Sequence, residues 1–175
     1  MVVLRGLPGE EESKALGAVL SAPVARSTFL WAKTAAMVVQ VVVASSAVAL
    51  GLVLGSLVGG LGLSAAGIVG VTLHVALLGV LFGAVAAAVG AATGARRLTM
   101  AVSAGSAAVA IVAWIVLPLV DALEGFVRLS PGYWFNSSVP LVSGPDLSHL
   151  LVLAGLALMW CLVAVGLFMC GDLKG

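Results

Sequence analysis

The stretch from Thr34 to Ala95 contains no Lys, Arg, Asp or Glu. A helix that crosses a bilayer needs about 20 consecutive apolar residues, so this stretch is too long for one crossing and suits two. Four glycines between Gly55 and Gly62 weaken the helix and mark the break between the crossings. We therefore expect one span at about 34–54 and a second at about 66–93.

Two more apolar runs follow the basic pair Arg96-Arg97, and they predict spans at about 98–119 and 148–170. The chain is 62% hydrophobic and only 9% charged, whereas soluble domains carry about 25% charged residues. A globule of this composition could not cover its surface with charge, so lipid must be the solvent for much of it. We expect an all-α, polytopic membrane protein, with a segment 1–33 before a transmembrane domain 34–175.

The basic residues predict the orientation of the four spans. If both termini lie in the cytoplasm, Arg128 is the only Lys or Arg outside, and the positive-inside rule favours this arrangement. A secretory signal needs a basic region directly before an apolar one, and the start of this chain lacks that pattern. We expect a multi-pass protein of the cytoplasmic (inner) membrane. The basic residues predicted inside are Arg5, Lys14, Arg26, Lys33, Arg96, Arg97 and Lys174.

The segment before the first span predicts an amphipathic helix. An acidic run suits the first turn of a helix, where the macrodipole favours negative charge, and apolar residues then recur at helical spacing. Pro23 would end this helix, and Arg26 follows it. An interfacial helix that only anchors the first span remains an alternative interpretation. The acidic residues are Glu10, Glu11 and Glu12, and the apolar ones are Leu16, Val19 and Leu20.

Residues 121–147 differ from the spans in holding charges, three prolines and an aromatic cluster. They predict an external segment, re-entrant or made of short helices, before the last span. Tyr133, Trp134 and Phe135 suit the headgroup zone, where amphipathic rings collect. We prefer simple anchoring for these three residues over a role in substrate binding.

His74 is the one titratable residue within the second predicted span. Ionisable groups inside a membrane are functional candidates by default, although a neutral imidazole bonded to a neighbouring carbonyl is the simpler interpretation. We also expect interhelical hydrogen bonds from the uncharged polar side chains in the spans, and close helix packing along glycines at every fourth residue. The polar residues are Gln40, Ser45, Ser46 and Thr72, and the glycines are Gly51, Gly55, Gly59, Gly79 and Gly83.

Several chemistries find no support in the sequence. It has no Gly-x4-Gly-Lys-Ser/Thr loop for nucleotide phosphates and no cluster of side chains suited to catalysis or metal binding. Cys161 and Cys170 would lie about 14 Å apart on one helix, too far for a disulfide. The net charge of +1 gives no electrostatic basis for binding nucleic acid. We expect neither an enzyme nor a bound cofactor or metal.

Two segments resemble the permease subunits of ABC-2 type transporters. The first runs from Glu10-Glu11-Glu12 to Pro23-Val24-Ala25-Arg26, and the second is Leu129-Ser130-Pro131-Gly132-Tyr133-Trp134 with the Pro140-Leu141 pair after it. Asp172-Leu173 is similar to the family's Arg-Asp-Leu ending, although Cys170-Gly171 replaces the basic residues. The resemblance covers about residues 10–173 and is closest to exporters of antibiotics or polyketides.

The resemblance implies that residues 10–26 form a coupling helix that docks on a separate ABC ATPase. Glu10, Glu11, Glu12, Leu16, Val19, Leu20, Pro23 and Arg26 are the residues this role would fall to. Family permeases have six spans per unit, and the first two would precede Glu10. The partners implied are therefore the ATPase, the missing permease helices or a second permease half, and membrane lipids.

Two other interpretations compete with a permease of an ATP-driven exporter of a lipophilic or antibiotic-like substrate. One is a small integral membrane protein with an assembly, immunity or anchoring role and no transport function. The other is a pore made of several copies of the chain, which the lack of a polar stripe along any span disfavours.

Overall fold

The computed structural model describes residues 26–170, which divide into two units, 26–37 and 38–170. The first unit is the beginning of a long helix, and the second holds everything discussed below. All regular secondary structure in the described part is helical. The elements are α2 (Arg26–Gly59), α3 (Ala65–Thr93), α4 (Arg96–Val116), the 3-10 helices η1 (Leu117–Leu119) and η2 (Asp121–Leu129), α5 (Pro131–Asn136), α6 (Pro140–Ser143) and α7 (Leu147–Cys170).

Four segments are long and apolar enough to cross a bilayer: Thr34–Gly59, Ala65–Thr93, Arg96–Leu119 and Leu147–Met169. Each lies in the 17- to 25-residue range of a spanning helix or slightly above it. The prediction of an all-α chain with four membrane helices is thus confirmed for the described residues. The chain is a multi-pass membrane protein.

The first span ends later than predicted, because α2 continues through Gly55 to Gly59. A single glycine costs a helix only about 1 kcal/mol, which packing and internal hydrogen bonding can outweigh in an apolar segment. The helix ends where Gly60 and Gly62 adopt φ of 62° and 58°. This left-handed region is open to glycine without steric cost, and the chain turns there into α3.

Beyond α4 the chain forms a series of short helices, as the sequence predicted for residues 121–147. The regular helix stops at Val116, three residues before the predicted end at 119, and Leu117–Leu119 form one turn of 3-10 helix. Pro118 explains the change because proline has no N–H to donate and clashes with the preceding turn. η2, α5 and α6 then connect α4 to α7.

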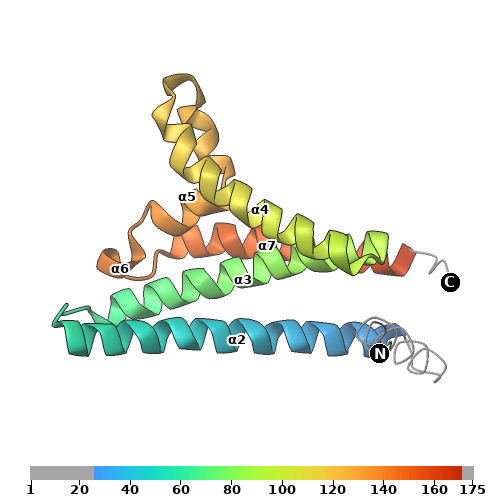
Figure 1. Cartoon of the computed structure of the whole chain (residues 1–175), viewed down its shortest axis with the longest axis horizontal. Coiled ribbons are helices and arrows are strands. Elements are labelled where there is room, and N and C mark those ends of the chain that lie inside the picture. The colour runs from blue at the N-terminus through green and yellow to red at the C-terminus, as the bar shows by residue number, and fades with distance from the viewer. Residues whose placement is uncertain (1–25, 171–175) are drawn as a thin grey trace, which may run out of the picture. The chain divides into compact units, whose positions relative to one another are not determined.

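Helices α3 and α7 form the packed centre of the second unit, lying side by side with their N-terminal ends at the same end of the pair (Figure 1). Their buried residues recur at three- and four-residue spacing, which places them on one face of each helix. Beyond the first turns of α3 most of them are alanines, so the two backbones approach closely, as is usual between helices in lipid. The buried residues are Gly67, Gly70, His74, Leu81, Ala84 and Ala88 on α3, and Leu153, Ala157 and Ala164 on α7.

Of the predicted glycine faces, the one on α3 packs within this chain. A Cβ at Gly79 would lie 3.2 Å from Cγ2 of Val41, so α2 approaches α3 at this point. At Gly51 and Gly55 nothing lies within 4 Å of the corresponding position. The α2 face that carries these two glycines therefore has no partner among the described residues.

Candidate functional site

The segment between α4 and α7 folds back onto α4 through Ser130. Its buried hydroxyl donates a 2.8 Å hydrogen bond to the carbonyl oxygen of Ala110 and accepts one from the Gly132 N–H at 3.2 Å. The second bond caps the N-terminus of α5, whose first residue is Pro131. A Cβ at Gly132 would lie 2.9 Å from Cβ of Trp114. Small residues thus let the segment sit directly against α4, more than one helical turn before that helix ends.

The predicted aromatic cluster is divided between two helices. The rings of Trp134 and His149 pack edge to face at 5.1 Å, and Tyr133 lies 5.2 Å from Trp134. Trp134 Nε1 also donates to the Arg128 carbonyl at 2.7 Å. Tyr133 and Trp134 therefore attach the segment to the start of α7. No partner for His149 could be named from the sequence, because its neighbours come from a separate helix.

Phe135, the third aromatic residue, turns instead toward α3 and covers His74. The two ring centroids lie 6.2 Å apart in a T-shaped arrangement. His74 is fully buried, with Nδ1 2.8 Å from the Gly70 carbonyl oxygen. Since a carbonyl only accepts hydrogen bonds, Nδ1 carries the proton and Nε2 is left as an acceptor. Nε2 has no hydrogen-bond partner.

α6 closes the segment against the first turns of α3. A Cβ at Gly67 would overlap the Leu141 carbonyl oxygen, and one at Gly70 would lie 2.7 Å from the Gly144 carbonyl carbon. Both glycines are buried by this contact. The absence of side chains on this face of α3 is what lets the α6 backbone approach it.

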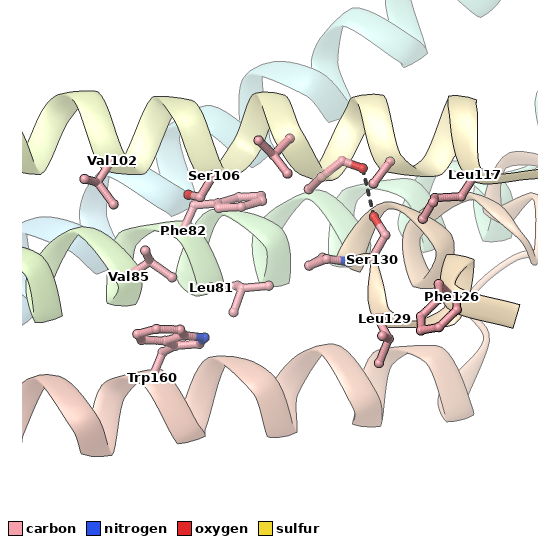
Figure 2. Close-up of a pocket in the computed structure, with 14 residues that line it drawn as sticks. Leu81, Phe82, Val85, Val102, Ser106, Leu117, Phe126, Leu129, Ser130 and Trp160 are labelled. Atoms are coloured by element: carbon pink, nitrogen blue, oxygen red, sulfur yellow. Dashed lines mark hydrogen bonds between the residues drawn. The ribbon is translucent and has the colours of Figure 1, made fainter. Parts of the chain in front are cut away.

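An apolar pocket of about 520 Å³ lies between α4 and α7, with α3 behind it and the η2–α5 connection at one end (Figure 2). Its volume falls within the roughly 300–1,000 Å³ range of small-molecule sites. No charged side chain lines it. The lining residues are Leu81, Phe82 and Val85 of α3; Val102, Ser106, Val109, Ala110 and Ala113 of α4; Leu117, Phe126, Leu129, Ser130 and Pro131 of the segment; and Trp160 of α7.

Three lining side chains carry polar atoms, and two of them already have partners. Ser130 bonds the Ala110 carbonyl as described above, and the Ser106 hydroxyl donates to the Ser103 carbonyl at 2.8 Å. Trp160 Nε1 has no hydrogen-bond acceptor among residues 26–170. The pocket thus offers a ligand an apolar wall and one free N–H donor.

This pocket was not predicted from the sequence. Its residues are ordinary apolar ones from four separate stretches of chain, so no local pattern distinguishes them from lipid-facing residues. The nearest local signal was the Leu129-Ser130-Pro131 run, which lines one end of the pocket.

The structure describes only part of the predicted coupling segment. Glu10, Glu11, Glu12, Leu16, Val19, Leu20 and Pro23 lie outside the described residues, and Arg26 is the first residue of α2. Within the spans, the predicted interhelical hydrogen bonds of Ser45 and Thr72 are wrong. Ser45 Oγ donates to Val41 O at 2.6 Å and Thr72 Oγ1 to Ile68 O at 2.7 Å, both within their own helix. A hydroxyl near the preceding turn reaches that carbonyl without needing a second helix.

Residues 26–170 contain no group of three His, Cys, Asp or Glu side chains that could hold a metal ion. Comparison of the chain with family models, curated proteins and solved structures finds no match in any of the three. A functional assignment therefore has to rest on the residues and their arrangement.

Proposed function

We propose that this chain is the membrane-spanning permease part of an ATP-driven ABC-2 type exporter, acting on a lipophilic or antibiotic-like substrate. In this proposal the chain lies in the cytoplasmic membrane with both termini in the cytoplasm. ATP is hydrolysed by a separate subunit, because the sequence contains no phosphate-binding loop of its own.

The observation that carries the proposal is the position of the permease-like motifs relative to the helices. Arg26, the last residue of the Pro23-Val24-Ala25-Arg26 motif, lies in α2, the first long helix described. The Leu129-Ser130-Pro131 run belongs to the short helices directly before α7, the last span. The proposal is supported by the order of the motifs along the chain, one leading into α2 and the other preceding α7.

The second motif also has a structural role that supports the resemblance. Ser130 joins the short-helix segment to α4, and Pro131 begins α5. A permease that changes between two states moves its helices as rigid bodies. A fixed junction of this kind would make α4 and the segment before α7 move together.

The apolar pocket supports a lipophilic cargo over an ionic one. A charged group buried without a partner costs several kcal/mol or more, and no charged side chain lines the pocket to pair with it. An uncharged, largely apolar molecule would enter this space from the lipid at little cost.

Co-purification with the ATPase tests the proposal. The full chain, carrying an affinity tag, is isolated in mild detergent from cells of its own source, and nucleotide-binding subunits with a phosphate-binding loop are sought by mass spectrometry. We expect one such subunit with the natural chain and its loss with Leu16→Glu and Leu20→Glu, because a buried charge would weaken an apolar docking face.

Leu7→Glu, before the acidic run, is the matched control and should keep the ATPase. All variants must reach the membrane fraction in equal amounts. The proposal would be contradicted if the ATPase co-purifies with both Leu16→Glu and Leu20→Glu, or if it co-purifies with none of the chains. Either result would favour an assembly, immunity or anchoring role.

A further inference from the structure

We propose that the pocket between α3, α4 and α7 is a binding site for an uncharged lipophilic molecule that carries a carbonyl oxygen, which accepts a hydrogen bond from Trp160 Nε1. Binding in this pocket does not depend on ATP-driven export. The proposal therefore stands or falls separately from the function proposed above.

The position of the pocket sets the polarity of its occupant. Trp160 lies near the middle of α7, and Leu81 near the middle of α3. Both helices are apolar enough to cross a bilayer, so the pocket lies at the depth of the hydrocarbon. Water is scarce there, and an unpaired polar group costs several kcal/mol. The occupant is thus a molecule that already partitions into lipid.

The shape of the pocket favours an elongated ligand. Its α4 wall extends from Val102 to Ala113, a length of about 16 Å at 1.5 Å per residue. Phe126, Leu129 and Ser130, of the segment that folds back onto α4, line one end of the pocket (Figure 2).

The indole N–H of Trp160 distinguishes a specific ligand from an ordinary lipid acyl chain. Its indole lies between α7 and α3, with the nitrogen on the side of Leu129 and Ser130 (Figure 2). A Trp N–H that is withdrawn from water normally finds an acceptor. A lipid acyl chain has no acceptor at this depth, because its ester groups lie at the interface. A carbonyl in the middle of a lipophilic molecule would satisfy the donor.

The serines cannot take over this role, which makes the site selective for one acceptor. Ser106 and Ser130 already donate their hydroxyl protons to the backbone of α4. The Ser106 oxygen can still accept one hydrogen bond, but no charged side chain lines the pocket, so a charged group on the ligand would stay unpaired at a cost that disfavours binding.

Photolabelling of the full chain in lipid nanodiscs, without any ATPase, tests the proposal. The probe is a long-chain ketone with a mid-chain carbonyl and a terminal diazirine, and the competitors are the unlabelled ketone and the alkane of equal length. Labelling should fall within residues 102–113 or around Trp160. The ketone should compete at a membrane mole fraction about three- to tenfold lower than the alkane, which is the effect of one net hydrogen bond.

Two variants test the Trp160 N–H donor and the pocket volume separately. Trp160→Phe keeps an aromatic ring but removes the N–H, and it should make ketone and alkane compete equally. Ala113→Phe fills the pocket and should reduce labelling severalfold, whereas Ala108→Phe, at an exposed position of the same helix, should leave labelling unchanged. If Ala113→Phe fails to fold, Trp160→Phe still decides the outcome.

The proposal is overturned if ketone and alkane compete equally with the natural chain, since the pocket then holds any acyl chain of the membrane. Unchanged ketone preference in Trp160→Phe overturns it as well. Unchanged labelling of a folded Ala113→Phe variant would also overturn the proposal.

Discussion

The hydroxyl of Ser130 reaches the carbonyl oxygen of Ala110, 20 residues earlier in the chain, at 2.8 Å. That carbonyl lies within α4, so the bond joins a membrane-depth helix to a segment outside the regular spans. The Ser130 hydroxyl oxygen also caps α5 by accepting a hydrogen bond from Gly132 N. One buried side chain thus fixes both where the segment attaches and where its next helix begins.

Removing this hydroxyl should loosen the segment. We expect Ser130→Ala to lower the free energy of unfolding by about 1–3 kcal/mol, because a helix cap and a buried hydrogen bond are lost together. Thermal unfolding in detergent measures the change. Ser46→Ala, at an exposed position of α2, is the control and should change stability by less than about 0.5 kcal/mol. Equal stability of the two variants would show that the Ser130 bond contributes nothing.

A methyl group at Gly67 should push α6 away from α3. Its Cβ would overlap the Leu141 carbonyl oxygen, which belongs to backbone and cannot rotate aside. We expect Gly67→Ala to destabilise the protein by about 1–3 kcal/mol or more. Gly55→Ala is the matched control on α2, where nothing lies within 4 Å, and it should be neutral or stabilising by up to about 1 kcal/mol. The idea fails if the two substitutions have the same effect on thermal unfolding.

Asp146 should make the start of α7 sensitive to acid. Its Oδ1 accepts hydrogen bonds from the Ser148 hydroxyl at 2.6 Å, from Ser148 N at 2.9 Å and from His149 N at 3.3 Å. The Ser148 side chain and then the His149 N–H hold the pKa of Asp146 below its ordinary value of 3.8. A lowered folded-state pKa stabilises the fold above the unfolded value, and this stabilisation is lost as pH falls through the folded value.

Titrating stability from about pH 5 to about pH 2 tests this expectation. Asp146→Asn keeps a good helix cap without a titrating group, so it should lose less stability across this range than the natural chain. Asp146→Ala should be less stable at pH 7, because the cap is absent at every pH. Parallel pH curves for the natural chain and Asp146→Asn would refute a role for the carboxylate.

The unpaired nitrogen of His74 predicts an unusual result for its removal. His74→Leu deletes a buried Nε2 that has no partner while filling much of the ring's space, and we expect it to leave stability unchanged or raise it by about 1 kcal/mol. His74→Ala leaves a cavity beside Phe135 and should cost about 2–4 kcal/mol. Chemical denaturation in detergent measures both. A large loss with His74→Leu would contradict this expectation, and it would mean that the Nδ1 bond to Gly70 stabilises the fold or that Nε2 binds a buried water.

The orientation of the spans can be measured with single cysteines in a chain whose Cys161 and Cys170 are replaced by Ala. Ser137 and Thr93 are exposed positions in the segment before α7 and at the end of α3. We expect a membrane-impermeant thiol reagent to label Ser137→Cys in intact cells and Thr93→Cys only after permeabilisation, as the positive-inside rule requires. The reverse pattern would refute the cytoplasmic placement of the termini.

The sequence was a good guide to the spans and a poor one to the pocket, for physical reasons. Lys33, Arg96 and Arg97 mark the ends of the long charge-free stretch, which holds two spans divided at the glycines between Gly55 and Gly62. The polar segment 121–147 separates the third span from the fourth. The end of α2 was placed five residues early because glycine weakens a helix without breaking it until φ turns positive at Gly60.

Side-chain partners depend on tertiary contacts that a single sequence does not contain. Tyr133, Trp134 and Phe135 are consecutive in the chain, yet they contact different helices, and only the fold shows that Phe135 covers His74. The hydroxyl of Ser45 was expected to bridge two helices and instead bonds its own backbone. Trp160 could not be singled out in the sequence, because only the fold shows that its indole N–H has no hydrogen-bond acceptor among residues 26–170.

The small residues between α3 and α7 also bear on how the protein can move. Alanine and glycine have no side-chain torsions to change, so the contact through Ala84, Ala88 and Ala157 cannot adjust by switching rotamers. We therefore expect α3 and α7 to move together as one rigid body. Any conformational cycle would leave this pair intact and place a flexible joint at the glycine turn after α2.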